Sequence, residues 1–284
     1  MVSFGVRLRA ANEARGALCV GIDPHPALLR AWGVGEDVRG LETFSRTVVD
    51  ALADRVAVLK PQSAFYERFG SAGIAVLERT VRAAREAGAL VLLDAKRGDI
   101  GSTASAYAEA YLHPASPLAV DALTVSPFLG AGSLDPFLDA AARHGAGVFV
   151  LALTSNPEGP ALQHAVRADG RTVARAIRDY AAVANAAAGS RQASALGHVG
   201  LVVGATVAPA AAAELELEGL GGPVLAPGLG AQGAGAADLA RVFGAARSAV
   251  LPTTSRDVLA AGPTPAGLRE AAARTLAECS AALA

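Results

Sequence analysis

Short apolar runs alternate with longer helix-forming stretches along the whole 284-residue chain. Eight of these runs have the length and composition of buried parallel strands, at 18–22, 56–59, 90–93, 119–125, 147–153, 199–203, 223–226 and 249–251. The stretches between and after them predict helices at 41–54, 74–87, 103–112, 133–144, 171–188, 209–218, 234–243 and 265–282. Eight strand–helix units without a linker predict a single α/β domain over residues 1–284, a (β/α)8 TIM barrel.

An open, doubly wound parallel sheet is the alternative fold, because it would show the same alternation. Such sheets usually open with Gly-x-Gly-x-x-Gly after the first strand, whereas this chain reads Gly-Ile-Asp-Pro-His-Pro at 21–26. The barrel is therefore the favoured fold. Residues 3–15 can form an additional helix that covers the bottom of the barrel.

The composition excludes several classes of protein. With 52% hydrophobic and 18% charged residues the chain can bury a large core, and its net charge of −1 argues against a dedicated nucleic-acid binder. The longest uncharged stretches are interrupted by Gly and Pro, and the N-terminus lacks the apolar segment of a secretory signal. The cysteines Cys19 and Cys279 form no disulfide framework and no metal-type spacing. We expect a cytoplasmic protein without a membrane or nucleic-acid partner.

Only two of the 25 basic residues are lysines, Lys60 and Lys96. Arginine replaces lysine wherever a solvated positive charge is enough, but it does not supply a compact, titratable ammonium. Lys60 directly follows the second predicted strand, and Lys96 lies just beyond the third. Barrels carry their chemistry at the C-terminal ends of the strands. We therefore predict that both lysines take part in the chemistry.

Carboxylates accompany these lysines. Asp94 and Lys96 are two residues apart, so the strand period turns them to the same face. A lysine flanked by carboxylates stays protonated, which suits a proton donor to a carbanion better than a Schiff-base nucleophile. Asp23 follows the first predicted strand, and Ser126 follows the fourth.

The last two strands end in a candidate phosphate site. The seventh leads into Pro-Gly-Leu-Gly-Ala-Gln-Gly at 227–233, which includes Gln232, and the eighth leads into Arg256. Backbone N–H groups near a helix start, together with an arginine, are typical phosphate ligands at this end of a barrel. The five histidines show no metal-ligand spacing, so the sequence gives no sign of a metal site.

The sequence Asp-Ala-Lys-Arg-Gly-Asp-Ile at 94–100 resembles the D-x-K-x-x-D-I signature of the orotidine 5'-phosphate decarboxylases. The chain is similar to their longer bacterial subgroup (type 2), also at Gly-Ile-Asp-Pro (21–24), Leu-Lys-Pro-Gln (59–62), Val-Ser-Pro-Phe (125–128) and 227–233. The resemblance implies a homodimeric enzyme of de novo pyrimidine biosynthesis that converts orotidine 5'-monophosphate to uridine 5'-monophosphate and CO2 without metal or cofactor.

The resemblance also implies roles for individual residues. Lys60, Asp94, Lys96 and Asp99 match a charge network in which Lys96 protonates C6 of the pyrimidine while Asp94 lies beside the departing carboxylate. The other matches are Asp23 and Lys60 for the ribose hydroxyls, Ser126 for the pyrimidine, Gln232 and Arg256 for the phosphate, and Asp99, Ile100 and Thr103 for the partner subunit's site. In the shorter members the phosphate arginine directly follows a glycine, whereas here it ends Leu-Pro-Thr-Thr-Ser-Arg. This departure leaves Arg247 as an alternative, although Arg247 would lie at the opposite end of the barrel.

Three other functions remain open at this stage. A sugar-phosphate decarboxylase of the same superfamily would need Mg²⁺, and a Schiff-base aldolase would use Lys60 or Lys96 as its nucleophile. A non-catalytic nucleotide-binding protein would keep the barrel without turnover.

Overall fold

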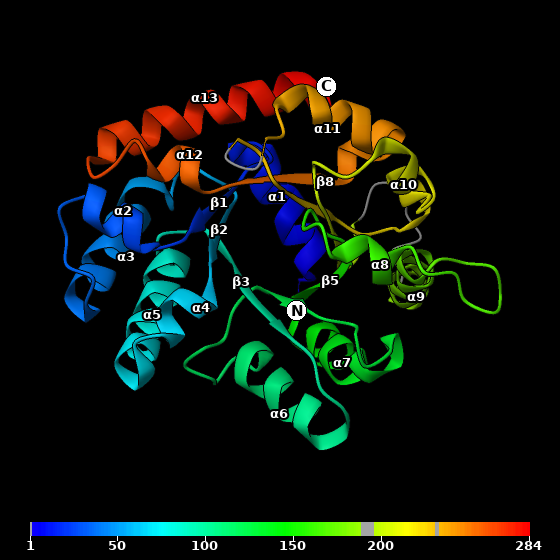
Figure 1. Ribbon diagram of the computed structural model, residues 1–284. Helices are drawn as coiled ribbons and strands as arrows, with labels where there is room; N and C mark the ends of the chain where they lie inside the picture. The colour runs from blue at the N-terminus through cyan, green and yellow to red at the C-terminus, as the bar shows by residue number, and fades with distance from the viewer. Residues whose placement is uncertain (1, 189–195, 231–232) are drawn as a thin grey trace.

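The computed structural model describes residues 2–188, 196–230 and 233–284 (Figure 1). Its parallel strands form a closed barrel in sequence order, and the last strand pairs with the first. The prediction of a TIM barrel is thus confirmed, and the open sheet is excluded. The strands are β1 (Cys19–Ile22), β2 (Val58–Pro61), β3 (Leu90–Arg97), β4 (Ala122–Val125), β5 (Gly147–Leu153), β6 (Val199–Val203), β7 (Val224–Pro227) and β8 (Val250–Thr254).

Helices surround the barrel, and the longer ones bury an apolar face (Figure 1). In α3, for example, Leu41, Phe44 and Val48 are fully buried at helical spacing, and Asp37 caps the first turn by accepting from the Gly40 N–H. The α-helices are α1 (Phe4–Arg15), α2 (Pro26–Ala31), α3 (Val38–Leu52), α4 (Ser63–Glu67), α5 (Gly70–Glu86), α6 (Gly101–Leu112), α7 (Asp135–His144), α8 (Gly159–Gln163), α9 (Val173–Ala187), α10 (Pro209–Ala213), α11 (Ala236–Phe243), α12 (Arg256–Leu259) and α13 (Pro265–Leu283). Three 3-10 helices complete the described elements, η1 (Ala131–Leu134), η2 (Leu217–Gly219) and η3 (Gly244–Ala249).

The structure corrects several predicted boundaries. The helix predicted over 209–218 ends at Ala213, because Glu216 takes a left-handed conformation with φ 47°. The strand predicted from 119 begins only at Ala122, since the Val120 N–H bonds to the Tyr111 carbonyl at the end of α6. β3 continues to Arg97, four residues beyond its predicted end. This extension carries Asp94 and Lys96 within the strand.

The N-terminal helix closes the bottom of the barrel. Phe4 and Leu8 of α1 are buried among the residues that fill the barrel interior. The Phe4 ring meets the Phe149 ring edge-on, with centroids 5.9 Å apart. Gly147 makes room for it, because a Cβ there would lie 2.4 Å from the Phe4 ring. The bottom is therefore packed with apolar side chains, and α1 lies behind the strands in Figure 1.

Candidate active site

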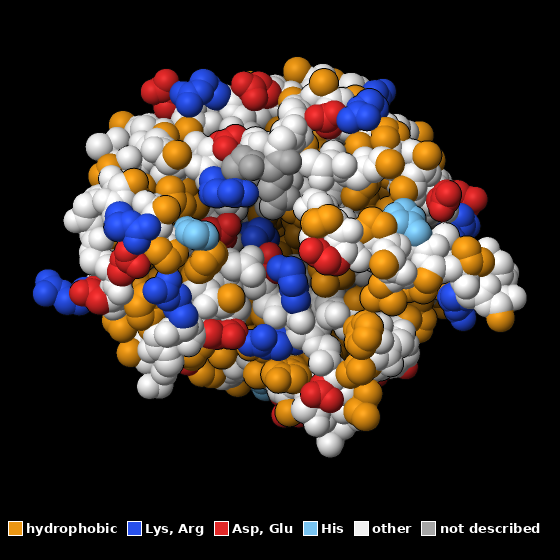
Figure 2. Space-filling model, in the orientation of Figure 1, with side chains coloured by type: hydrophobic (Ala, Val, Ile, Leu, Met, Phe, Trp, Pro, Cys, Tyr) orange, Lys and Arg blue, Asp and Glu red, His pale blue; other side chains and the backbone are white. Residues whose placement is uncertain are grey.

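A cavity of about 840 Å³ opens at the C-terminal ends of the strands. Figure 2 shows the hollow at the centre of this face, with acidic and basic side chains gathered in it. Six of the residues predicted from the sequence line this one cavity: Asp23, Lys60, Asp94, Lys96, Ser126 and Arg256. These residues are far apart in the sequence but lie together, because the barrel brings the C-terminal ends of its strands to one rim.

Asp94 is held between the two lysines of the chain. Its Oδ2 accepts from Lys60 Nζ at 3.1 Å, and its Oδ1 accepts from Lys96 Nζ at 2.5 Å. The side chains of Lys60 and Asp94 are only 6% and 12% exposed, whereas that of Lys96 is 46% exposed. Lys60 and Asp94 are therefore the buried members of the cluster, and the Lys96 ammonium is the exposed one.

The electrostatics of the cluster keep Lys60 and Asp94 charged. Burial by itself would lower the pKa of Lys60, but Asp94 and then Asp23 reverse this and hold the pKa above its usual 10.5. Burial by itself would raise the pKa of Asp94, but the ammonium groups of Lys60 and Lys96 hold it well below its usual 3.8. The Asp94 carboxylate and the Lys60 ammonium are thus held together in a buried part of the cavity wall, where charge acts most strongly on a reacting group.

The backbone around Lys96 departs from a regular strand. Lys96 has φ 48°, and the pairing of β3 with β4 shifts register between Leu93 and Arg97. The contact between Asp94 and Lys96 was predicted from the strand period alone, yet the structure makes it through this left-handed residue. Just beyond it, Gly98 passes so close to Ser126 that a Cβ would lie 2.5 Å from the Ser126 carbonyl oxygen.

Asp23 offers an acceptor to a ligand. It follows β1, and its Oδ1 is buried and has no hydrogen-bond partner among the described residues. A buried carboxylate oxygen without a donor is costly, and a ligand hydroxyl would satisfy it. The absence of a side chain at Gly21 lets Ser255 and Asp23 pack closely against the backbone of β1. A Cβ at this position would lie 1.9 Å from Ser255 Oγ and 3.1 Å from Asp23 Oδ1.

The ends of β7 and β8 form another part of the wall. Gly228 and Leu229 line the cavity after β7, and Arg256 begins α12 directly after β8. Gly230 lies tightly against α12, since a Cβ there would meet the Asp257 carboxylate at 1.5 Å. Arg247 belongs to η3 before β8, at the other end of that strand. Gln232 lies outside the described residues.

Three predicted site residues lie outside the lining of their own chain's cavity. Asp99, Ile100 and Thr103 lie at the start of α6, where the Ile100 N–H donates to Asp99 Oδ1 at 2.8 Å. Ile100 is 62% exposed, and in the neighbouring loop Phe128 is 74% exposed. Phe128 also lines the cavity, so an exposed apolar side chain lies at the cavity mouth.

Sequence reasoning missed several residues in the wall. Gln62, two residues after Lys60, lines the cavity, and the strand period applied to Lys60 predicts its side chain on the same face. Thr124 and Thr154 also line it, from the ends of β4 and β5. Thr124 Oγ1 donates to Asp94 Oδ1 at 2.9 Å.

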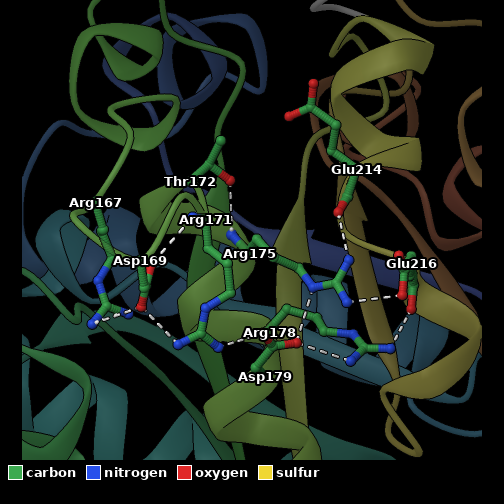
Figure 3. Close-up of polar contacts among 9 residues, drawn as sticks. All are labelled: Arg167, Asp169, Arg171, Thr172, Arg175, Arg178, Asp179, Glu214 and Glu216. Atoms are coloured by element: carbon green, nitrogen blue, oxygen red, sulfur yellow. Dashed lines mark hydrogen bonds and ion pairs between the residues drawn. The ribbon is translucent and has the colours of Figure 1, made fainter.

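A network of ion pairs supports the wall formed by α9. Val173 and Ile177 of α9 line the cavity. On another part of the helix, Asp179 accepts from three arginines at 2.8–3.1 Å, and Arg175 also reaches Glu216 at 2.8 Å (Figure 3). The arginines on Asp179 are Arg171, Arg175 and Arg178. The network thus ties α9 to the segment before η2.

Across residues 2–188, 196–230 and 233–284, no three His, Cys, Asp or Glu side chains gather in a way that could hold a metal ion. Within the same ranges, no helix combines the length and hydropathy needed to cross a membrane.

Comparisons with known proteins agree over nearly the full length. A family model described as "Orotidine 5'-phosphate decarboxylase / HUMPS family" matches residues 16–271. The orotidine 5'-phosphate decarboxylase of Salinispora tropica is 64% identical over 283 residues, covering 100% of this chain and 99% of the relative. That of Streptomyces coelicolor is 60% identical over 278 residues, covering 98% and 97%.

Solved structures share the same architecture. A crystal structure of a Streptomyces avermitilis protein superposes with a TM-score of 0.94 at 58% identity, covering 100% of this chain and 96% of that one. The OMP decarboxylase of Leishmania donovani superposes with a TM-score of 0.78 at 31% identity, covering 99% of both chains.

Proposed function

Because the chain belongs to the orotidine 5'-phosphate decarboxylase / HUMPS family, we propose that it is a carboxy-lyase that converts orotidine 5'-monophosphate to uridine 5'-monophosphate and CO2. The observation that carries the proposal is the cluster in which Asp94 joins Lys60 and Lys96 at the cavity. A reaction that passes through a carbanion needs such a fixed positive charge beside the reacting carbon. The proposed reaction belongs to de novo pyrimidine biosynthesis, and we assign it to the cytoplasm, where the free thiols of Cys19 and Cys279 stay reduced.

In the proposed mechanism, the bond between C6 of the pyrimidine and its carboxylate carbon breaks, and CO2 leaves. The electron pair that remains on C6 takes a proton from Lys96 Nζ, and solvent returns a proton to the lysine afterwards. Asp94 lies beside the leaving carboxylate and holds Lys96 through the 2.5 Å contact. Asp23 and Lys60 bind ribose hydroxyls, a role supported by the unpartnered Asp23 Oδ1. Ser126 contacts the pyrimidine.

Turnover is expected to need neither metal nor organic cofactor, since the lysine–aspartate cluster itself supplies the charge and the proton. The test follows the loss of orotidine 5'-monophosphate absorbance in buffer that contains EDTA. Full activity after chelation supports the proposal. Activity that disappears with EDTA and returns with Mg²⁺ would favour the sugar-phosphate type of chemistry, and a complete lack of turnover would refute the decarboxylase.

The phosphate is proposed to bind between Gln232 and Arg256, with backbone N–H groups after β7. The support is that Arg256 lines the cavity at the start of α12. Arg256→Ala should raise KM for orotidine 5'-monophosphate by about 10- to 100-fold, the worth of a charge-assisted hydrogen bond. It should barely change turnover of the phosphate-free nucleoside.

Arg247→Ala is the matched control, because it removes an arginine from the opposite end of β8. It should leave both substrates unaffected. An equal loss for nucleotide and nucleoside in Arg256→Ala would instead mean that Arg256 acts on the fold. A selective loss in Arg247→Ala would transfer the phosphate role to that residue.

We also propose a homodimer in which Asp99, Ile100 and Thr103 complete the partner's site. The support is their position outside their own cavity lining, together with the exposed side chains of Ile100 and Phe128. A twofold interface is isologous, so each subunit would lend its Asp99 to the other.

Mixing two inactive variants, Lys96→Ala and Asp99→Ala, tests this arrangement under conditions where subunits exchange. If Asp99 acts in the partner's site, each mixed dimer carries one site with both lesions and one intact site. Random exchange makes about half of the dimers mixed, so about a quarter of wild-type activity should return. If mass spectrometry shows exchange and no activity returns, the shared site is wrong.

A further inference from the structure

The hydroxyl of Thr124 joins the backbone at Lys96 to the carboxylate of Asp94. Thr124 lies in β4 and is 1% exposed. Its Oγ1 accepts hydrogen bonds from the backbone N–H groups of Ala95 and Lys96, both at 3.0 Å. The same oxygen donates to Asp94 Oδ1 at 2.9 Å. A single atom therefore contacts three consecutive residues of β3.

These three bonds use the whole capacity of the hydroxyl group, which has one proton and two lone pairs. Because the two N–H groups occupy the lone pairs, the proton is directed to Asp94. Consecutive amides of a regular strand point to opposite sides, whereas here two converge on one oxygen. The convergence accompanies the φ of 48° at Lys96, and successive amides arranged in this way form a small concave site for an oxygen. The Thr124 oxygen thus stabilises a conformation that residues other than glycine rarely adopt.

The position of the Lys96 ammonium depends on both ends of this arrangement. At one end, Thr124 fixes the Lys96 backbone N–H. At the other end, Asp94 Oδ1 accepts hydrogen bonds from both the Thr124 hydroxyl and Lys96 Nζ. We infer that Thr124 is a positioning residue for the decarboxylation, holding Asp94 and Lys96 in the geometry from which Lys96 protonates the substrate. This inference rests on the proposed function.

Thr124→Val tests the inference, because valine keeps the shape of threonine and removes the hydroxyl. We expect kcat to fall by about 10- to 100-fold, the size of effect that a small misplacement of a catalytic group produces. KM should stay within about threefold of the wild-type value. Calorimetry with the product uridine 5'-monophosphate should show a dissociation constant within about threefold of wild type and an unchanged stoichiometry. Thr124→Ser, which restores the hydroxyl, should recover most of kcat. If Thr124→Val does not fold, Thr124→Ala, which leaves space for water beside the two amides, takes its place.

Thr80→Val is the matched control. Thr80 is buried in α5, where its hydroxyl donates to the Val76 carbonyl at 2.8 Å, and its substitution should leave kcat unchanged. The inference is overturned if Thr124→Val leaves kcat unchanged, or if it weakens product binding by the same factor as it lowers kcat. It is also overturned if Thr124→Ser does not restore kcat. Wild-type protein is assayed first: without turnover both the proposed function and the inference fall, whereas wild-type turnover with an unaffected Thr124→Val refutes the inference alone.

Discussion

Lys96→Ala is expected to lower kcat by more than about ten-thousandfold while the protein remains folded. General acid catalysis alone contributes about 10²–10⁴-fold, and the electrostatic stabilisation of the carbanion is lost together with the proton donor. The fold should tolerate the change, because the Lys96 side chain is 46% exposed and contributes little to the core. The measurements are kcat with orotidine 5'-monophosphate and a thermal unfolding curve.

Two further variants isolate the role of this ammonium. Lys96→Arg keeps the positive charge but not the compact, titratable amine, so it should stay nearly inactive. Arg46→Ala removes an exposed cation that pairs with Asp50 on α3, and it should retain wild-type kcat. A folded Lys96→Ala protein with near-normal kcat would refute the assignment of Lys96 as proton donor.

Asp94→Asn is expected to reduce both activity and stability. Asparagine has no charge to hold the two ammonium groups, so kcat should fall by about a thousandfold, the upper size found for single electrostatic groups in active sites. The free energy of unfolding should fall by about 3 kcal/mol, because Lys60 is 5% exposed and would lose its nearest counter-charge. Denaturant unfolding and kcat measure the two effects separately.

The stability difference should depend on pH in one direction. The pKa of Asp94 is lowered in the folded state, so its contribution is fully present above the usual 3.8 and is lost as the pH falls below that value. The difference between wild type and Asp94→Asn should thus be constant between about pH 5 and 7 and shrink in stronger acid. A difference that grows on acidification would contradict this account.

Asp121→Asn provides the matched control for the activity loss. Asp121 is also buried, at 4% exposure, and pairs with Arg7 and Arg85 at 2.5 and 3.5 Å. It lies just before β4, at the end of the barrel opposite the cavity. Its substitution should destabilise the protein but leave kcat unchanged. Loss of kcat in both variants would mean that activity follows stability rather than the charge of Asp94.

The barrel and much of its site were predictable because they depend on local patterns. Alternating strand and helix periods predicted the α/β units, the missing Gly-x-Gly-x-x-Gly after the first strand favoured the barrel over an open sheet, and the rule that strand ends converge brought Lys60, Asp94 and Lys96 together. The same rule distinguishes Arg256, after β8, from Arg247, before it. Gln62 was within reach of this reasoning and was missed only because the strand period was not applied to it.

Other features depend on contacts that no local pattern contains. The role of Thr124 requires the register shift of β3 and the positive φ of Lys96, and a lysine gives no sequence signal for a left-handed conformation. Short helices such as α8 and α12 span only five and four residues, too few for a periodic pattern. Whether Asp99 serves its own site or another depends on a second chain.

The scarcity of lysine gives the folded chain an unusual chemical property. An amine-acylating reagent meets only one accessible lysine side chain, since that of Lys60 is 6% exposed and that of Lys96 is 46% exposed. The arginines are inert to such reagents. Acylation of a lysine side chain is therefore directed into the cavity, and a bound ligand would protect Lys96. The extent of labelling at Lys96, read by peptide mass mapping, then reports the fraction of empty sites without any need to engineer a probe.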